Sequence, residues 1–175
     1  MAQTSMILVC GLPGTGKTFF AERLAKSLEI RHLNTDGTRE RLGLRGHYDP
    51  KVKEQVYQSM FALSGQYLKW GDDVLLDATF HKANRRRQAL DTAREHGASV
   101  YVIQVEAREL LVRNRLDRPR ADSEADEMVY HNLKDEREAI LLPHLTLISG
   151  DYTLNNMLEI AQHYLSGPAL GPKQF

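Results

Sequence analysis

The sequence has one cysteine, no long hydrophobic run and no excess of either charge. Cys10 stands alone, so no disulfide can form within the chain. Because it ends an apolar run, we expect a buried thiol, as suits a reducing cytoplasm. No segment approaches the roughly 18 apolar residues of a membrane span, and the first residues lack the basic region of a signal peptide. Since 23 Lys and Arg balance 23 Asp and Glu, no overall field steers the chain to nucleic acid or membrane. We therefore expect a cytoplasmic protein without a membrane partner.

Short apolar runs alternate with helical patterns along the 175 residues, a length that suits one domain spanning 1–175. The apolar runs predict strands at 6–10, 32–34, 73–77, 99–105 and 145–149. Periodicity and capping residues predict helices at 18–30, 50–70, 84–97, 107–116, 123–140 and 154–165. We expect the tail, 167–175, to be loose. The alternation predicts a three-layer α/β fold with a parallel sheet, helices on both faces, and ligands at the carboxyl ends of the strands.

The first strand leads into the segment GLPGTGKT, which matches the phosphate-loop pattern G-x-x-x-x-G-K-S/T in full. Its glycines let the backbone curl so that N–H groups point at phosphate oxygens, and the helix that follows adds positive partial charge. Lys17 is expected to reach the β- and γ-phosphates as a catalytic group, and Thr18 to ligate Mg²⁺. The alternative is a glycine turn that arose by chance. The expected nucleotide-binding residues of this segment are Gly11, Leu12, Pro13, Gly14, Thr15, Gly16, Lys17 and Thr18.

Two further acids follow strands. In VLLDAT, Asp77 ends a buried strand, where an acid in a phosphate-loop protein binds Mg²⁺ directly or through water; the alternative is a cap of a helix or turn. Thr79 either orients a phosphate or water or has a plain turn role.

Asp36, in NTDGTRE, has Arg39 three residues on, and the pair could hold a hydroxylated acceptor, with Asp36 as the base. Alternatively, Asp36 caps the short helix that contains Arg39.

Arginines gather in two segments. VRNRLDRPR contains Arg113, Arg115, Arg118 and Arg120 and suits a lid at about 117–126 that closes over the transferring phosphate. We assign catalytic roles to Arg115 and Arg118 and a nucleotide contact to Arg113; the alternative is a solvated face paired with the acidic helix that follows.

In NRRRQ, Arg85 is the first choice for the residue that contacts an anionic acceptor. An exposed basic first turn is at least as good an interpretation for Arg86 and Arg87. Such a turn opposes the helix dipole and needs compensation, for example by a bound phosphate.

Together, GLPGTGKT, NTDGTR, LLDAT and LLVRNRLDR resemble the small P-loop kinases, in particular the kinase domain of phage polynucleotide kinase and its bacterial relatives. Gluconate-kinase-like and zeta-toxin-like kinases are similar in plan, and the likeness extends from Met6 to about Ser149. The resemblance implies a five-stranded sheet in the order 2-3-1-4-5, with Asp36 as general base and Arg39 on the acceptor. It also implies a phosphate-clamping arginine at position 115 or 118.

These observations favour a Mg²⁺- and ATP-dependent kinase. Its acceptor would be a hydroxyl of a small polar molecule or a nucleic acid 5′-hydroxyl. The alternative is a P-loop switch or ATPase without a phosphoryl acceptor. ATP as the donor follows from the resemblance alone, and the sequence leaves protein partners open.

Overall fold

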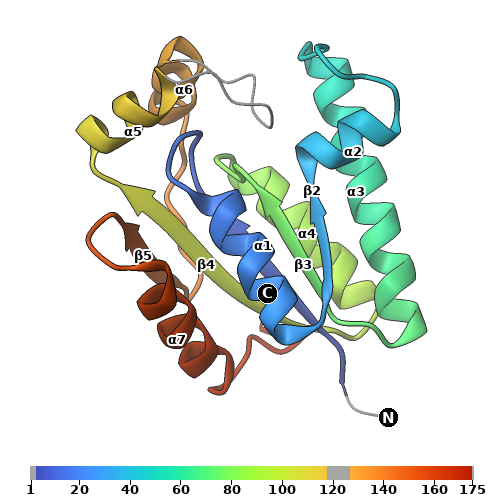
Figure 1. Ribbon diagram of the computed structural model, residues 1–175. Helices are drawn as coiled ribbons and strands as arrows, with labels where there is room; N and C mark the ends of the chain where they lie inside the picture. The colour runs from blue at the N-terminus through green and yellow to red at the C-terminus, as the bar shows by residue number, and fades with distance from the viewer. Residues whose placement is uncertain (1–2, 118–126, 175) are drawn as a thin grey trace.

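The computed structural model describes residues 3–117 and 127–174. Five strands form one parallel sheet in the order β2-β3-β1-β4-β5, which confirms the predicted topology (Figure 1). The strands are β1 Ser5–Cys10, β2 Arg31–Asn34, β3 Val74–Ala78, β4 Ser99–Ala107 and β5 Leu145–Ser149. The described helices are α1 Lys17–Leu28, α2 Thr35–Arg41, α3 Pro50–Trp70, α4 Ala83–Glu95, α5 Glu109–Leu116, α6 Glu127–Asp135 and α7 Leu154–Leu165.

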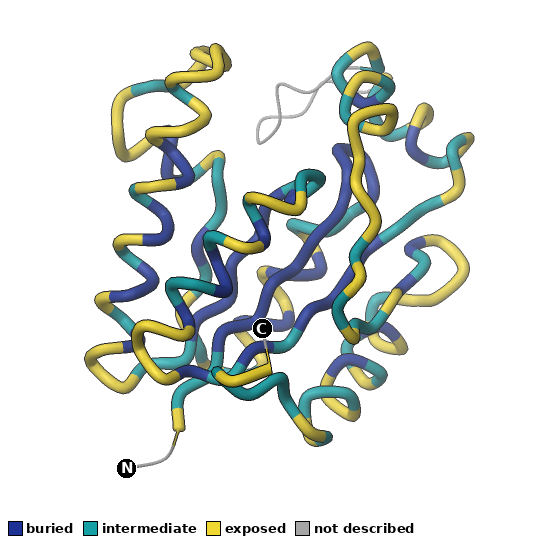
Figure 2. The backbone as a smooth tube through the Cα atoms, turned by 180° about the vertical axis from the view of Figure 1, so that it is seen from behind, coloured by how far each residue is buried: buried dark blue, intermediate teal, exposed yellow. Residues whose placement is uncertain are grey.

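The core has two halves, one on each face of the sheet. Alternate residues of β1 divide between them: Met6 and Leu8 pack toward α3 and α4, while Ile7 and Val9 pack toward α1 and α7. The central strands are therefore buried on both faces, as Figure 2 shows, which is why they appear in the sequence as continuous apolar runs. No helix among the described residues is both long and apolar enough to cross a membrane.

Local capping rules account for several helix ends. Asp49 caps α3 by accepting from the N–H groups of Lys51 and Val52, both at 3.1 Å, and Pro50 takes the first helical position. Helix α2 is capped by Asn34, whose Oδ1 accepts from the N–H of Gly37 at 2.6 Å. The interpretation of Asp36 as the cap of this helix is therefore wrong, and its carboxylate is left for other contacts.

Two expectations about the C-terminal half need correction. The helix predicted at 123–140 ends at Asp135, and its predicted start lies outside the described residues. Beyond Asp135 the chain has no apolar periodicity, and the N–H of Glu138 instead donates to the carbonyl of His81 at 2.8 Å. The tail is held to β4, because Leu170 and Val100 exchange two backbone hydrogen bonds of 2.8 and 2.9 Å and the hydroxyl of Tyr101 donates to the carbonyl of Gly167 at 3.1 Å.

Candidate functional site

The phosphate loop lies between the carboxyl end of β1 and the start of α1. Gly16, the N-cap of α1, has φ 87°, and the helix start has no side-chain cap and no acidic residue in its first turn. Its first N–H groups are thus left for an anion, which the helix dipole also favours. A Cβ on Gly11 would lie 2.6 Å from the carbonyl oxygen of Val105, so the close approach of β4 requires glycine there.

A cleft of about 410 Å³ opens beside this loop. Figure 1 shows α5 and α6 over one part of the carboxyl edge of the sheet and α2 with the start of α3 over the other. Residues of α2, α3, α6 and the turn after β3 line the cleft together with the phosphate loop. The lining side chains with polar groups include Lys17, Thr18, Asp36, Arg39, Tyr48, Lys53, Tyr57, Thr79 and His81.

Asp36 and Arg39 form an ion pair at the cleft wall, with Oδ1 and Nη1 2.7 Å apart. The Arg39 side chain is 8% exposed and lies over the ring of Tyr48, with 4.4 Å between guanidinium carbon and ring centroid. The Asp36 side chain remains 55% exposed. Desolvation at the wall raises the pKa of Asp36 from its ordinary value, against the opposing effect of Arg39 and Lys17. A raised pKa makes the carboxylate a better proton acceptor.

Asp77 is the most buried acid of the site. Its side chain is 1% exposed, and neither carboxylate oxygen has a hydrogen-bond partner among the described residues. The imidazole of His32 lies beside it, with Nε2 3.5 Å from Oδ2. An unpartnered buried carboxylate is costly unless a cation or water meets it, and Mg²⁺ prefers such oxygen ligands. Asp77, with the Thr18 hydroxyl on the first turn of α1, therefore fits a magnesium site.

The turn after β3 contains two further candidates. Thr79 lines the cleft, and its Oγ1 lies 3.4 Å from the hydroxyl of Tyr57 and 3.2 Å from Nδ1 of His81. Arg85 is not among the described residues that line the cleft. It pairs with Glu54 at 2.6 Å and stacks on Tyr57 at 4.7 Å, so its charge already has a carboxylate partner.

The first turn of α4 differs from the expected exposed basic turn. Arg87 is exposed as expected, but Arg86 is only 5% exposed and donates to backbone carbonyls. The helix start is compensated by the carboxylate of Glu138, whose Oε2 accepts from the N–H of Ala83 at 2.5 Å. A protein carboxylate thus supplies the negative charge that this helix start needs, in the place of a bound phosphate.

Of the arginines in VRNRLDRPR, the structure describes Arg113 and Arg115, and these two have different partners. Arg115 donates from Nη1 to the Gly14 carbonyl at 3.1 Å and from Nη2 to Oγ of Ser149 at 2.9 Å, so it joins the phosphate loop to the end of β5. Arg113 pairs with Glu109 at 2.9 Å and Glu127 at 3.2 Å. Arg118, Arg120 and most of the lid at 117–126 lie outside the described residues.

Sequence reasoning missed several residues that the fold brings to the site. His32 lies on the edge strand beside Asp77, and Tyr48, Lys53 and Tyr57 reach the cleft from α3 and the segment before it. His81 comes from the turn after β3. Of these, only His81 could have been predicted from the sequence, because it lies in the turn that follows Asp77 and ligands bind at the carboxyl ends of parallel strands.

Comparison with known proteins shows the family and the fold of this chain. The sequence matches the family described as AAA domain over residues 6–140. A gluconokinase from Sinorhizobium meliloti is similar in structure, with TM-score 0.69 and 14% identity over 95% of this chain and 94% of that one. An APS kinase from Mycobacterium tuberculosis, in complex with AMPPNP and APS, has TM-score 0.72 and 15% identity over 95% of this chain and 100% of its own. Kti12 from Chaetomium thermophilum, in complex with ADP-AlF3, has TM-score 0.70 and 20% identity over 93% and 100%.

At these identities the structures establish the fold alone, and they confirm the resemblance to the small P-loop kinases that the motifs indicated. The family match covers the phosphate loop, Asp36, Asp77 and both arginine segments. The chain therefore belongs to the AAA domain family, and its fold is that of the P-loop kinases.

Proposed function

We propose that this protein is a cytoplasmic, Mg²⁺-dependent kinase that transfers the γ-phosphoryl group of ATP to a hydroxyl of a small polar molecule or a nucleic acid 5′-end. One observation supports this most directly: Lys17 of the phosphate loop and the Asp36–Arg39 pair line the same cleft. Phosphoryl transfer depends mainly on positioning and charge neutralisation, to which a hydroxyl acceptor adds the need for a nearby base.

Each group has a defined role in this proposal. The phosphate loop and Lys17 bind the triphosphate, while Thr18 and Asp77 would hold Mg²⁺, which neutralises phosphate charge when bound. Asp36 accepts the proton of the acceptor hydroxyl as its oxygen bonds to the γ-phosphorus and the bond to the ADP oxygen breaks. Arg39 and Thr79 bind the acceptor. Arg85 stacks on the ring of Tyr57 and so supports the wall of the cleft that Tyr57 lines.

The lid arginines complete the proposed site. Arg115, which donates to the Gly14 carbonyl of the phosphate loop, would stabilise charge on the β- and γ-phosphates. Arg118 is proposed to reach the transferring group, and Arg113 the nucleotide. An arginine fork is suited to this role because it binds phosphate oxygens in pairs.

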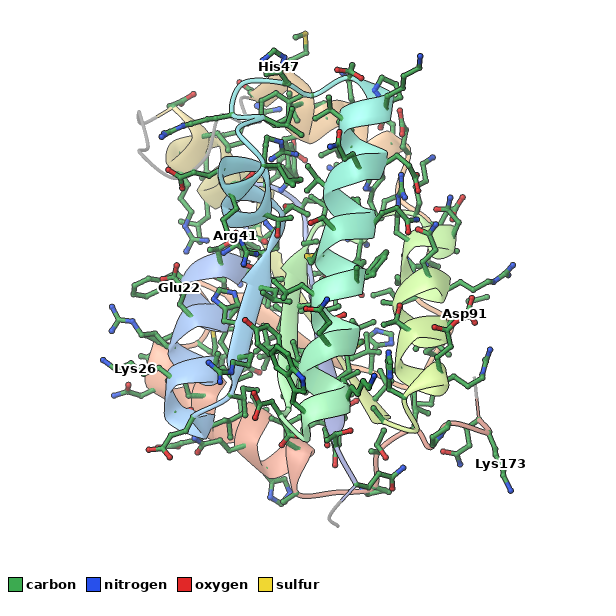
Figure 3. All side chains as sticks on the ribbon, turned by 90° about the vertical axis from the view of Figure 1, so that its right-hand side faces the viewer. Glu22, Lys26, Arg41, His47, Asp91 and Lys173 are labelled. Carbon is green, nitrogen blue, oxygen red and sulfur yellow. The ribbon has the colours of Figure 1, made fainter. Side chains whose placement is uncertain are left out.

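The experiment is a transfer screen with labelled ATP against 5′-hydroxyl oligonucleotides, sugars, nucleosides and aminoglycosides. The proposal expects transfer to at least one acceptor class, lost in Asp36→Asn while nucleotide binding is kept. Asp91→Asn is the matched control, because Asp91 lies on the outer side of α4, away from the cleft (Figure 3). ATP hydrolysis that no acceptor stimulates and that Asp36→Asn leaves intact would instead support the switch or ATPase alternative.

A further inference from the structure

The turn after β3 has a strained backbone at the cleft. Phe80 has φ 46°, a left-handed conformation that is costly for a residue with a side chain. Its ring is 1% exposed and packs edge-on against Tyr57, with centroids 5.8 Å apart. On either side of Phe80, Thr79 and His81 both line the cleft, with Oγ1 and Nδ1 3.2 Å apart. The strained turn thus presents two hydrogen-bonding side chains to the site.

Arg86 holds this turn from behind. Its Nη1 donates to the carbonyl of Phe80 at 2.7 Å, and its Nη2 to the carbonyls of Ala139 at 2.7 Å and Glu138 at 3.2 Å. The residue is 5% exposed, and none of the ion pairs among residues 3–117 and 127–174 involves it. A buried guanidinium is tolerated only when its donors are satisfied. Three carbonyls from two chain segments accept hydrogen bonds from it here.

The second segment, 136–139, connects α6 to the loop before β5 and bonds to the same turn by other contacts. The N–H of Glu138 donates to the carbonyl of His81 at 2.8 Å, and its carboxylate accepts from the N–H of Ala83 at 2.5 Å. Glu136 lies 3.8 Å from Nε2 of His81 and 3.5 Å from Nζ of Lys82. Two segments more than fifty residues apart are therefore joined by main-chain and side-chain contacts around Arg86.

We propose that Arg86 is a positioning residue for acceptor recognition: it locks the turn 79–83 to segment 136–139 and so presents Thr79 and His81 to the acceptor. The contact of these two side chains with an acceptor rests on the proposed kinase function, whereas the lock does not. A hydroxyl and an imidazole that both donate and accept hydrogen bonds suit an acceptor with hydroxyls beyond the reacting one. In support, burial lowers the pKa of His81, with Lys82 and Lys53 acting in the same direction and Glu136 and Glu138 against it, which favours the neutral ring.

Hydrogen exchange on the intact protein tests the lock directly. In Arg86→Gln, the amides of Ala83 and Glu138 are expected to exchange about tenfold faster or more, and together, because both depend on the same unit. Arg86→Lys, which keeps the charge but not the fork, should show a smaller increase in both. Arg87→Gln is the matched control on the exposed side of the same turn and should change neither. A change confined to one segment, or no change, overturns the lock.

Glu138→Ala provides a second test if the Arg86 variants do not fold. Glu138 is exposed, so this variant is expected to fold. It removes the acceptor of the Ala83 amide but leaves the amide of residue 138 bonded to His81. Faster exchange at both amides supports a single unit, and faster exchange at position 83 alone contradicts it.

Kinetics test the acceptor part. With the acceptor found in the transfer screen, Arg86→Lys should raise the acceptor KM about tenfold while AMPPNP affinity in the presence of Mg²⁺ stays within about twofold. A loosened lock with an unchanged acceptor KM would overturn the role in recognition. If the wild-type protein transfers to no acceptor, the proposed function fails and the acceptor part falls with it, while the exchange result still decides the lock.

Discussion

Asp77 and His32 face each other across the neighbouring strands β3 and β2, with Oδ2 and Nε2 3.5 Å apart. All three polar atoms at this contact, both Asp77 oxygens and Nε2 of His32, are buried and lack hydrogen-bond partners among the described residues. A small movement would let the imidazole N–H donate to the carboxylate, and second-shell bonds of this kind orient metal ligands. His32 thus stands behind the proposed magnesium ligand.

Replacing either member of this pair should change the magnesium requirement. We expect Asp77→Asn and His32→Leu each to raise the Mg²⁺ concentration needed for nucleotide binding by about tenfold or more. His32→Gln keeps an N–H donor, so its Mg²⁺ requirement should stay close to that of the wild type. The measurement is the thermal shift of the protein with AMPPNP as Mg²⁺ is titrated. Arg31→Gln, on the exposed neighbour, is the control. An unchanged Mg²⁺ midpoint in Asp77→Asn would remove this residue from the metal site.

Lys17 should matter more for turnover than for folding. Lys17→Ala is expected to reduce kcat/KM by about 100-fold or more, since it removes a cation from the charge that develops on the phosphates. Lys26→Ala is the matched control on the same helix, where Lys26 points away from the sheet (Figure 3). Steady-state transfer measures turnover, and thermal unfolding without nucleotide measures stability, so the two effects are separated. Normal turnover in Lys17→Ala would exclude the phosphate role.

The raised pKa of Asp36 predicts the shape of the acid limb of the pH–rate profile. Desolvation is the largest cause of the raised pKa, so Asp36 gains its proton at a higher pH than an ordinary aspartate with a pKa of about 3.9. As the pH falls, the base is lost and the rate should decline through this raised pKa. Asp36→Asn should lose this limb and about 10²-fold or more in rate. The same limb in the variant would assign the titration to another group.

Arg115 and Arg118 should have different effects. Arg115→Lys is expected to weaken ATP binding about tenfold, because lysine cannot bond to Gly14 and Ser149 with the same fork. Arg118→Ala should lower turnover more than ATP binding. Titration with AMPPNP and single-turnover transfer measure the two quantities, with Arg94→Gln as a remote control. Equal loss of binding in both variants would contradict the division of roles.

The buried thiol of Cys10 should lower the free energy of unfolding at alkaline pH. Burial, with a smaller contribution from Asp77, raises the pKa of Cys10 from 9.0 to about 12, against Arg86 and Lys17. Above pH ~9 the unfolded thiol ionises while the folded one stays protonated, so unfolding becomes easier by up to about 1.4 kcal/mol per pH unit until the folded pKa is reached. Below pH ~9 this contribution is constant. Urea unfolding of wild type and Cys10→Ala at pH 8, 9 and 10 should give a steeper decline for the wild type, and parallel declines would show that the thiol does not contribute.

The sequence by itself determined the phosphate loop, the alternation of strands and helices, and the Asp36–Arg39 pair. Each depends on a local pattern: glycine spacing, a run of apolar residues, or two side chains three positions apart on one helical turn. The fold class follows from the same periodicities, since buried parallel strands and amphipathic helices need one another to form a core.

Tertiary structure alone decided which isolated charges meet. Arg115 reaches Gly14 across 101 positions of sequence, and Glu138 caps α4 across 55. Arg86 is buried against carbonyls, although its position in NRRRQ suggested an exposed charge. These contacts depend on how whole elements pack, and no local pattern encodes a distance between segments far apart in the chain. Packing also buried the Asp77 carboxylate beside His32, where it has no hydrogen-bond partner among residues 3–117 and 127–174.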